Sequence, residues 1–253
     1  MIVINRERFD PSPLLGDYAA GSLERKTLEL IAASSMTYSY NSLNQLRFEI
    51  RMRREIVNAA IALNGTRFAF TVFQSSTCNP EYWIRMPDGG FALRDGVKPS
   101  DAIRDIFLQS RLYGTECATA MVIVYYKALL EIFPEEAFNK IFTNIHLMNW
   151  QRIERPLREI GMIRRSSTYL PGDRRYIANP DVNPLTPELQ GENVIDLGDG
   201  RFYGHGFGIH TVDVFIAALN ANRRAGAERS AYLMDTVSYP NFKLLSDLYD
   251  RNT

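Results

Sequence analysis

Cysteine and histidine are scarce in this sequence, which has two cysteines and three histidines among 253 residues. A small secreted domain held by disulfides would carry more cysteines, so Cys78 and Cys117 suit a reducing compartment at synthesis. The few cysteines and histidines show no ligand spacing of a zinc site. The glycine patterns of a phosphate-binding loop and of a dinucleotide-binding fold are also absent.

Net charge and long apolar runs are lacking as well. Lysine plus arginine number 29 and aspartate plus glutamate number 29, so no overall positive charge attracts nucleic acid or an anionic membrane. The arginines between 152 and 165 are expected to form a solvated face. The apolar run 118–126 is too short to span a bilayer, and the apolar run after Met1 is too short for a signal peptide. We therefore expect synthesis in the cytosol, with neither nucleic acid nor membrane as a partner.

The remaining composition is that of a globular protein, with 45% hydrophobic and 23% charged residues. No repeat or linker divides the chain, so we expect one domain over 1–253. Capping residues and apolar spacing predict helices over 23–33, 43–63, 100–108, 116–133, 212–223 and 241–250. Runs rich in β-branched and aromatic residues predict strands over 68–73, 82–86, 91–94, 174–178, 193–197, 201–204 and 231–234. Because helices gather in the first half and strands in the second, the sequence indicates an α+β fold.

The helix predicted over 43–63 has the most complete set of sequence signals. Ser42 and Gln45 have the spacing of a capping box, and Asn64-Gly65 gives a stop. Its predicted apolar stripe consists of Leu46, Ile50, Val57 and Ile61.

The segment from Tyr113 to Ala120 is the most informative for chemistry. Thr115 is a candidate cap, so Cys117 falls in the first turn of a strongly apolar helix. Free backbone N–H groups and the positive end of the helix dipole favour a thiolate there and offer donors for an oxyanion. The helix behind Cys117 is apolar on nearly every side, which predicts a buried central helix. From position alone, Cys117 is equally compatible with an inert core thiol.

A thiol nucleophile needs a base, and three residues are candidates. His205 is flanked by glycines after a predicted strand, Glu192 begins a strand, and Glu116 adjoins Cys117. Each also has an ordinary interpretation: a turn histidine, a surface carboxylate and a carboxylate at the helix dipole, respectively. Cys78, in a turn-like context, is interpreted as a bystander.

Several motifs in order along the chain resemble the spore-coat transglutaminase family of endospore-forming bacteria. The segments that carry the resemblance are Thr115–Ala120, Gly191–Ile195, His205–Ile209 and Ser230–Met234, with Tyr82–Trp83, Ala102–Ile106 and Pro171–Asp173 as further matches. The resemblance covers nearly the whole chain and is loosest at its two ends.

The resemblance implies a calcium-independent protein-glutamine γ-glutamyltransferase that needs no cofactor or metal and cross-links glutamine- and lysine-bearing spore coat proteins. It implies a papain-like core, similar to that of cell-wall peptidases, with the nucleophile at the start of a buried central helix packed on an antiparallel sheet. It assigns Cys117 as the nucleophile and Glu192 as its main acid/base partner. Glu116 is an alternative partner, and His205 matches a histidine that lines the site.

Aromatic residues wall the catalytic tunnel of that family, and Phe70, Trp150 and Tyr176 are the matches here. The sequence departs from the family at Leu189, where tryptophan can stand, and at Arg174-Arg175, where apolar residues are common. The two arginines favour an edge position for the strand over 174–178. Two other functions stay open: a papain-like cysteine amidase or peptidase that uses Cys117 and His205, and a catalytically inactive structural coat protein.

Overall fold

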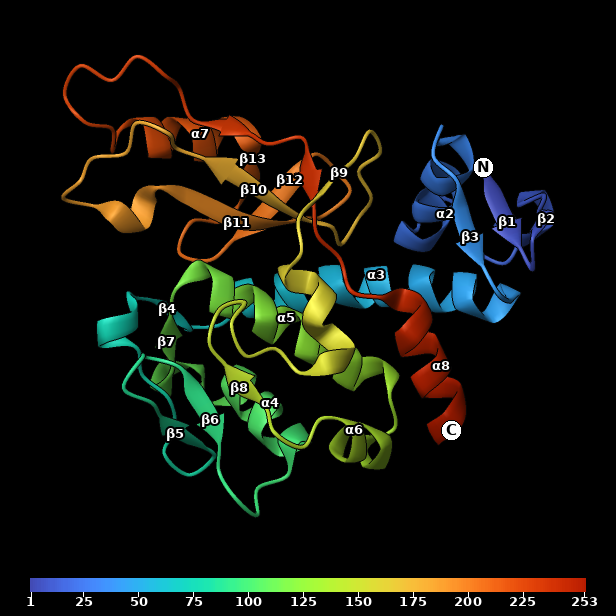
Figure 1. Ribbon diagram of the computed structural model, residues 1–253, viewed down its shortest axis with the longest axis horizontal. Coiled ribbons are helices and arrows are strands. Elements are labelled where there is room, and N and C mark those ends of the chain that lie inside the picture. Colours follow the sequence, from blue (N-terminus) through green and yellow to red (C-terminus); the bar gives the residue numbers. More distant parts are fainter.

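The computed structural model describes residues 1–253 and combines α-helices with one large and several small β-sheets (Figure 1). The helices are α1 Ser12–Leu15, α2 Leu23–Ala33, α3 Leu43–Asn64, α4 Pro99–Leu108, α5 Cys117–Ile132, α6 Glu135–Ile141, α7 Val212–Asn220 and α8 Phe242–Asn252. None of these helices combines the length and apolar character that crossing a bilayer requires.

Helix α5 forms the centre of the molecule, as the sequence predicts. Every residue from Ala120 to Tyr126 is fully buried. The helix packs along α3, and it also contacts α4, α6 and strand β11 (Gly191–Asp196). A helix that is apolar all round is stable only when other elements cover every side, which these neighbours do.

An antiparallel five-stranded sheet lies over the N-terminal half of α5 (Figure 1). Its strand order is β13 (Gly208–Thr211), β12 (Arg201–Gly204), β11, β10 (Arg174–Ala178) and β14 (Tyr232–Leu233). Helix α7 covers the outer face, where Phe215 and Leu219 pack with sheet residues Ile177, Val194 and Phe202. The expected mixture of helices and an antiparallel sheet is confirmed.

The edge position expected for the strand over 174–178 is wrong, since β10 lies between β11 and β14. Both of its arginines are buried, and each donates hydrogen bonds to backbone carbonyls of other segments. Arg175 donates to the carbonyls of Met234 and Thr236 and stacks over Tyr169. The arginines thus bind the chain that covers β10 and do not face solvent along a free edge.

The smaller sheets include several strand pairings that the sequence did not predict. Strands β1 (Ile2–Ile4), β2 (Glu7–Arg8) and β3 (Tyr38–Tyr40) form one sheet, and β5 (Trp83–Arg85), β6 (Phe91–Leu93) and β8 (His146–Leu147) form another. Strand β9 (Arg164–Arg165) pairs with β15 (Thr236–Val237), and β4 (Ala69–Phe70) pairs in parallel with β7 (Gly114–Thr115). The β4–β7 pair holds Phe70 beside the residues that lead into α5.

Two predicted helix starts are confirmed by capping contacts. Ser22 caps α2 by accepting from the Arg25 N–H, and Ser42 caps α3 by accepting from the Gln45 N–H. Gln45 completes the box by accepting from the Asn41 N–H. The hairpin around Asp88-Gly89-Gly90 is also present, with β5 and β6 antiparallel.

Other predictions are wrong in detail. Thr115 lies in β7, and the residue that caps α5 is Glu116. The strand expected over 68–73 is reduced to Ala69–Phe70, because the chain turns into a 3₁₀-helix at Phe73. Ile61, assigned to an apolar stripe, is 47% exposed. Helix α7 ends at Asn220, earlier than expected, and β1 to β3 and α6 were not predicted.

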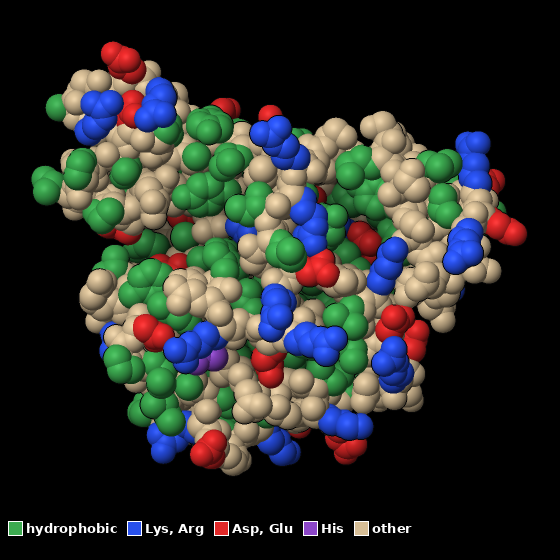
Figure 2. Space-filling model, viewed as in Figure 1, with side chains coloured by type: hydrophobic (Ala, Val, Ile, Leu, Met, Phe, Trp, Pro, Cys, Tyr) green, Lys and Arg blue, Asp and Glu red, His purple; other side chains and the backbone are tan.

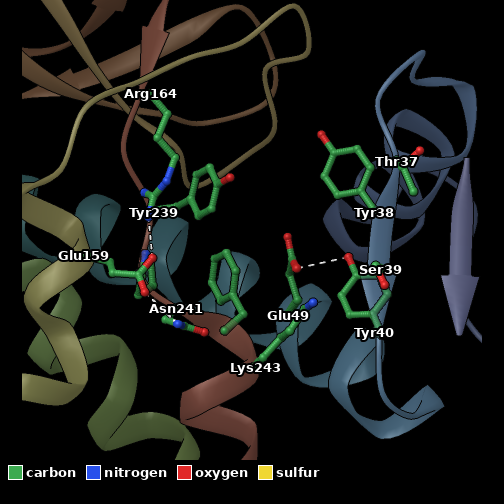
Figure 3. A pocket seen from close by; sticks show the side chains of 12 residues that line it. Thr37, Tyr38, Ser39, Tyr40, Glu49, Glu159, Arg164, Tyr239, Asn241 and Lys243 are labelled. Atoms are coloured by element: carbon green, nitrogen blue, oxygen red, sulfur yellow. Dashed lines mark hydrogen bonds and ion pairs between the residues drawn. The ribbon is translucent and has the colours of Figure 1, made fainter. Parts of the chain in front are cut away.

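A buried ionic network links α3, β3 and the turn before β10. The Arg53 guanidinium, 1% exposed, donates to Glu49 Oε1 at 2.9 Å and to Asp173 Oδ1 at 2.8 Å. Tyr40 donates to the other Glu49 oxygen at 3.0 Å. Figure 3 shows Glu49 and Tyr40 facing a cavity of about 380 Å³ between β3 and the start of α8, opposite Tyr239. On the other side of β3, the N-terminal strands pack on α3 and Leu170, where Ile2 and Tyr40 share a cluster with Leu46 and Ile50.

We predict that Arg53→Met lowers the free energy of unfolding by about 3–5 kcal/mol, because two buried carboxylates lose their cation. Equilibrium urea unfolding measures this quantity. Arg54→Met is the matched control: the Arg54 side chain is 36% exposed where it pairs with Glu24 and Glu55, so about 1 kcal/mol or less is expected. Equal losses for the two variants would contradict the structural role of the network.

Candidate active site

A cavity of about 620 Å³ opens at the N-terminal end of α5. Five of the residues singled out from the sequence line it together: Phe70, Glu116, Cys117, Trp150 and Tyr176. They come from distant parts of the chain and meet where the sheet lies over α5. Figure 2 shows the surface hollowed between these two parts of the molecule, with hydrophobic side chains gathered along the edge. The three aromatic matches therefore surround the proposed nucleophile.

Cys117 is the first residue of α5, and its side chain is partly exposed to this cavity. The Asn193 side-chain amide donates to its sulfur at 3.4 Å. Burial raises the pKa of the Cys117 thiol above its usual range, and the nearby carboxyls of Glu192 and Glu116 raise it further. The N-terminal position in α5 favours the thiolate, whereas burial and the two neighbouring carboxyls favour the neutral thiol.

Glu192 lies in β11 and is 2% exposed, although it is not among the residues that line the cavity. Burial raises the pKa of its carboxyl well above the ordinary value, and Glu116 raises it further. The Cys117 side chain and the His205 backbone act in the opposite direction. Its Oε1 atom has no hydrogen-bond partner. Two interacting acids titrate as a pair, so the protonation of Cys117 and that of Glu192 depend on each other.

Glu116 has a different role in the structure, as the N-cap of α5. Its carboxylate accepts from the Ala118 N–H at 2.5 Å and the Thr119 N–H at 2.8 Å, and from the Thr119 hydroxyl. Burial raises the pKa of the Glu116 carboxyl, while these hydrogen bonds lower it. Both of its oxygens thus cap the N-terminus of α5, whereas Glu192 has an oxygen that makes no hydrogen bond.

His205 is buried behind the wall of the cavity and does not line it. Its ring stacks on Phe68 with centroids 4.7 Å apart, and burial lowers its pKa to about 4. Nε2 lies 3.1 Å from the Ala69 carbonyl oxygen and therefore carries the proton, which leaves Nδ1 to accept from the Tyr203 hydroxyl at 3.3 Å. A neutral histidine with both nitrogens engaged supports the β4 strand that carries Phe70.

Two residues at the site escaped the analysis of the sequence as functional candidates. Asn193 contacts the Cys117 sulfur, and Arg174 stacks over the Trp150 ring at 4.3 Å. Alternation along β11 gave no signal for Asn193, because neighbouring residues of a strand face opposite sides and Glu192 was already assigned to Cys117. Leu189, which departs from the family pattern, packs with the α7 cluster and does not line the cavity.

Gly191 is required by the close approach of Tyr176. A Cβ atom at this position would lie 2.3 Å from the tyrosine hydroxyl, so any larger residue would displace that side chain from the cavity wall. The glycine that begins the motif 191–195 thus has a steric role.

Comparisons with known proteins agree on one family. A family model described as protein-glutamine gamma-glutamyltransferase matches residues 1–249. The protein-glutamine gamma-glutamyltransferase of Bacillus cereus (strain B4264) is 41% identical over 100% of this chain and 91% of its own length. That of Halalkalibacterium halodurans is 42% identical over 86% of this chain and 76% of its length. The solved structure of a transglutaminase from Geobacillus stearothermophilus, without its C-terminal extension, is 48% identical, with a TM-score of 0.78 over 82% of this chain and 98% of that one.

We predict that Glu192→Gln shifts the pH dependence of Cys117 alkylation to lower pH. The Glu192 carboxylate raises the thiol pKa by its negative charge, and the neutral amide removes that charge, so the thiolate forms at lower pH. The rate of iodoacetamide reaction across pH measures the shift, in a Cys78→Ala background.

Glu188→Gln is the matched control, because Glu188 is an exposed carboxylate at the same cavity. Its profile is expected to coincide with that of the parent. A Glu192→Gln profile that also coincides with the parent would mean that Cys117 and Glu192 do not titrate together.

Proposed function

This chain belongs to the protein-glutamine gamma-glutamyltransferase family and is a transglutaminase, and on that premise we propose that Cys117 carries the glutamyl group as a thioester. The observation that most favours this role is the pairing of the Cys117 thiol with a buried carboxyl, Glu192, at an open cavity. Covalent catalysis of this kind needs a nucleophile and a base within reach of each other, and this pair supplies both.

In the first half of the proposed reaction, the Cys117 thiol transfers its proton to Glu192 and the sulfur attacks the γ-carboxamide carbon of a glutamine side chain. Glu192 then returns the proton to the leaving nitrogen, ammonia departs, and a thioester remains. Glu116 already occupies the N–H groups of Ala118 and Thr119. The oxyanion therefore depends on the remaining donors at this end of α5, among them the Cys117 N–H.

In the second half, the neutral amine of a lysine side chain attacks the thioester carbon. Glu192 accepts a proton from the attacking nitrogen and passes it to the departing Cys117 sulfur, so the pair returns to its starting state. The product is an ε-(γ-glutamyl)lysine isopeptide bond. The aromatic walls formed by Phe70, Trp150 and Tyr176 limit water at the thioester and so favour the amine over hydrolysis.

We further propose the setting implied by the resemblance. Residues 1–253 act as one catalytic domain with a papain-like core, and every step above uses only groups of the chain, without calcium. The substrates are glutamine- and lysine-bearing proteins of the spore coat, where the enzyme resides after synthesis in the cytoplasm. The full-length similarity to relatives from Bacillus species supports this proposal.

A cysteine amidase or peptidase that uses Cys117 and His205 is less well supported. The ring nitrogens of His205 contact Ala69 and Tyr203, and burial lowers its pKa to about 4, so it is a poor proton acceptor at neutral pH. An inactive structural coat protein would need neither a carboxyl partner for Cys117 nor an open cavity beside it.

The first prediction for this function concerns transfer itself. In the presence of a calcium chelator, the protein is expected to incorporate a fluorescent primary amine into a glutamine-rich protein, and Cys117→Ala is expected to abolish labelling. Cys78→Ala is the control, because burial raises the pKa of the Cys78 thiol to about 11 and it lies outside the cavity. Ammonia release without labelling would indicate a hydrolase, and neither product would indicate a structural protein.

The second prediction separates the two carboxylates. Glu192→Ala is expected to reduce kcat by roughly 10²–10⁴-fold, the usual contribution of a general acid–base. Glu116→Ala is expected to reduce kcat much less, while lowering the free energy of unfolding by about 1 kcal/mol through loss of the helix cap. Steady-state amine incorporation and urea unfolding measure the two effects. Comparable losses of kcat would contradict Glu192 as the main partner.

A further inference from the structure

Arg174 is a buried cation beside the active-site cavity. Its side chain is 3% exposed, lies over the Trp150 ring and donates from Nη2 to the Ile160 carbonyl at 3.2 Å. Its backbone is held at the start of β10 by a reciprocal pair of hydrogen bonds with Ser238. Burying a guanidinium is costly unless its N–H groups find acceptors, so the acceptor of the other terminal nitrogen, Nη1, indicates what the side chain does.

One of those donors begins a chain of hydrogen bonds to the nucleophile. Arg174 Nη1 donates to Asn193 Oδ1 at 2.7 Å, and Asn193 Nδ2 donates to Cys117 Sγ at 3.4 Å. A guanidinium has donors only, so the atom of Asn193 that faces it must be the oxygen. The amide –NH₂ group is thereby directed at the sulfur. Without Arg174, nothing in this chain of contacts prevents the amide from turning its oxygen toward Cys117.

We propose that Arg174 is a positioning residue for the transferase reaction, which locks the Asn193 amide so that an N–H donor always faces the Cys117 sulfur. The donor favours the thiolate when Cys117 attacks glutamine and again when it leaves the thioester. This inference rests on the proposed role of Cys117 as the nucleophile.

The surroundings of Cys117 explain why such a donor matters. The titratable groups that influence the thiol from neighbouring elements are Glu116, Glu192, Tyr176, Tyr203 and Arg174. Arg174 is the cation in this set, and the two carboxyls raise the thiol pKa. The hydrogen bond from Asn193 lowers the pKa of the Cys117 thiol and so opposes them.

The first test compares Arg174→Met with Arg175→Met, both in a Cys78→Ala background. Arg175 is an equally buried arginine of the same strand whose donors go to Met234 and Thr236 and not to Asn193. Arg174→Met is expected to move the alkylation profile of Cys117 to higher pH and to lower kcat by roughly tenfold, with KM for the acyl donor nearly unchanged. Arg175→Met is expected to change neither the profile nor kcat.

The second test asks whether Arg174 acts through Asn193. Asn193→Ala is expected to reproduce the effects of Arg174→Met, and the double variant is expected to show no further change. Arg174→Lys keeps one donor toward Asn193 and is expected to recover most of the lost kcat. If Arg174→Met does not fold, as judged by circular dichroism, the comparison of Arg174→Lys and Asn193→Ala still decides the question.

The proposal is overturned if Arg174→Met behaves like Arg175→Met, or if it has its full effect in the Asn193→Ala background. In the absence of a folded Met variant, it is overturned if Arg174→Lys is as impaired as Asn193→Ala. Alkylation reports on the thiol whether or not the protein transfers acyl groups. A failure of the proposed function would therefore remove the amine-incorporation signal but leave the alkylation profiles to judge Arg174.

Discussion

The burial of helix α5 is the constraint on which the rest of the structure depends. Residues 120–126 are fully buried, so neighbouring elements must cover the helix on every side. Helix α3 and the five-stranded sheet provide much of this cover, and the cavity opens at the first turn of α5. Cys117 is consequently the residue at which a water-excluding core meets an open cavity. The site lies at the end of the core, and the carboxyls beside Cys117, those of Glu116 and Glu192, are buried there in surroundings of low polarity.

That low polarity determines the acid–base chemistry. A thiol at a helix N-terminus is commonly expected to ionise easily, but here burial and two nearby carboxyls raise the pKa of the Cys117 thiol. The same burial raises the pKa of the Glu192 carboxyl, so both groups of the pair bind protons more tightly than they would in water. A proton that moves from one group to the other leaves the net charge of the pair unchanged. Such a pair needs no histidine, which fits the engagement of His205 elsewhere.

The sequence was sufficient for the features that depend on local physics. Caps at Ser22 and Ser42, the apolar run of α5 and the turn around Gly89 each follow from neighbouring residues. The motifs, taken in their order along the chain, were sufficient to identify the family. The sequence could not indicate that Arg174 and Arg175 are buried, because two adjacent arginines suggest solvent until their carbonyl partners from residues 160, 234 and 236 are known. The N-terminal strands were not predicted for the same reason, because β1 pairs with β3, which lies more than thirty residues later.

The two carboxyl side chains next to Cys117 illustrate how position gives similar groups different surroundings. Glu116 is fixed by three hydrogen bonds at the helix end, so a proton on it would weaken the cap of α5. Glu192 has an oxygen without a hydrogen-bond partner in a buried strand, so a proton can bind there without displacing a contact. Moving a proton from Cys117 to that oxygen therefore breaks no hydrogen bond of the fold and transfers the negative charge to the sulfur. Glu116 and Glu192 are close in space, and Glu192 is the one with an oxygen that makes no hydrogen bond.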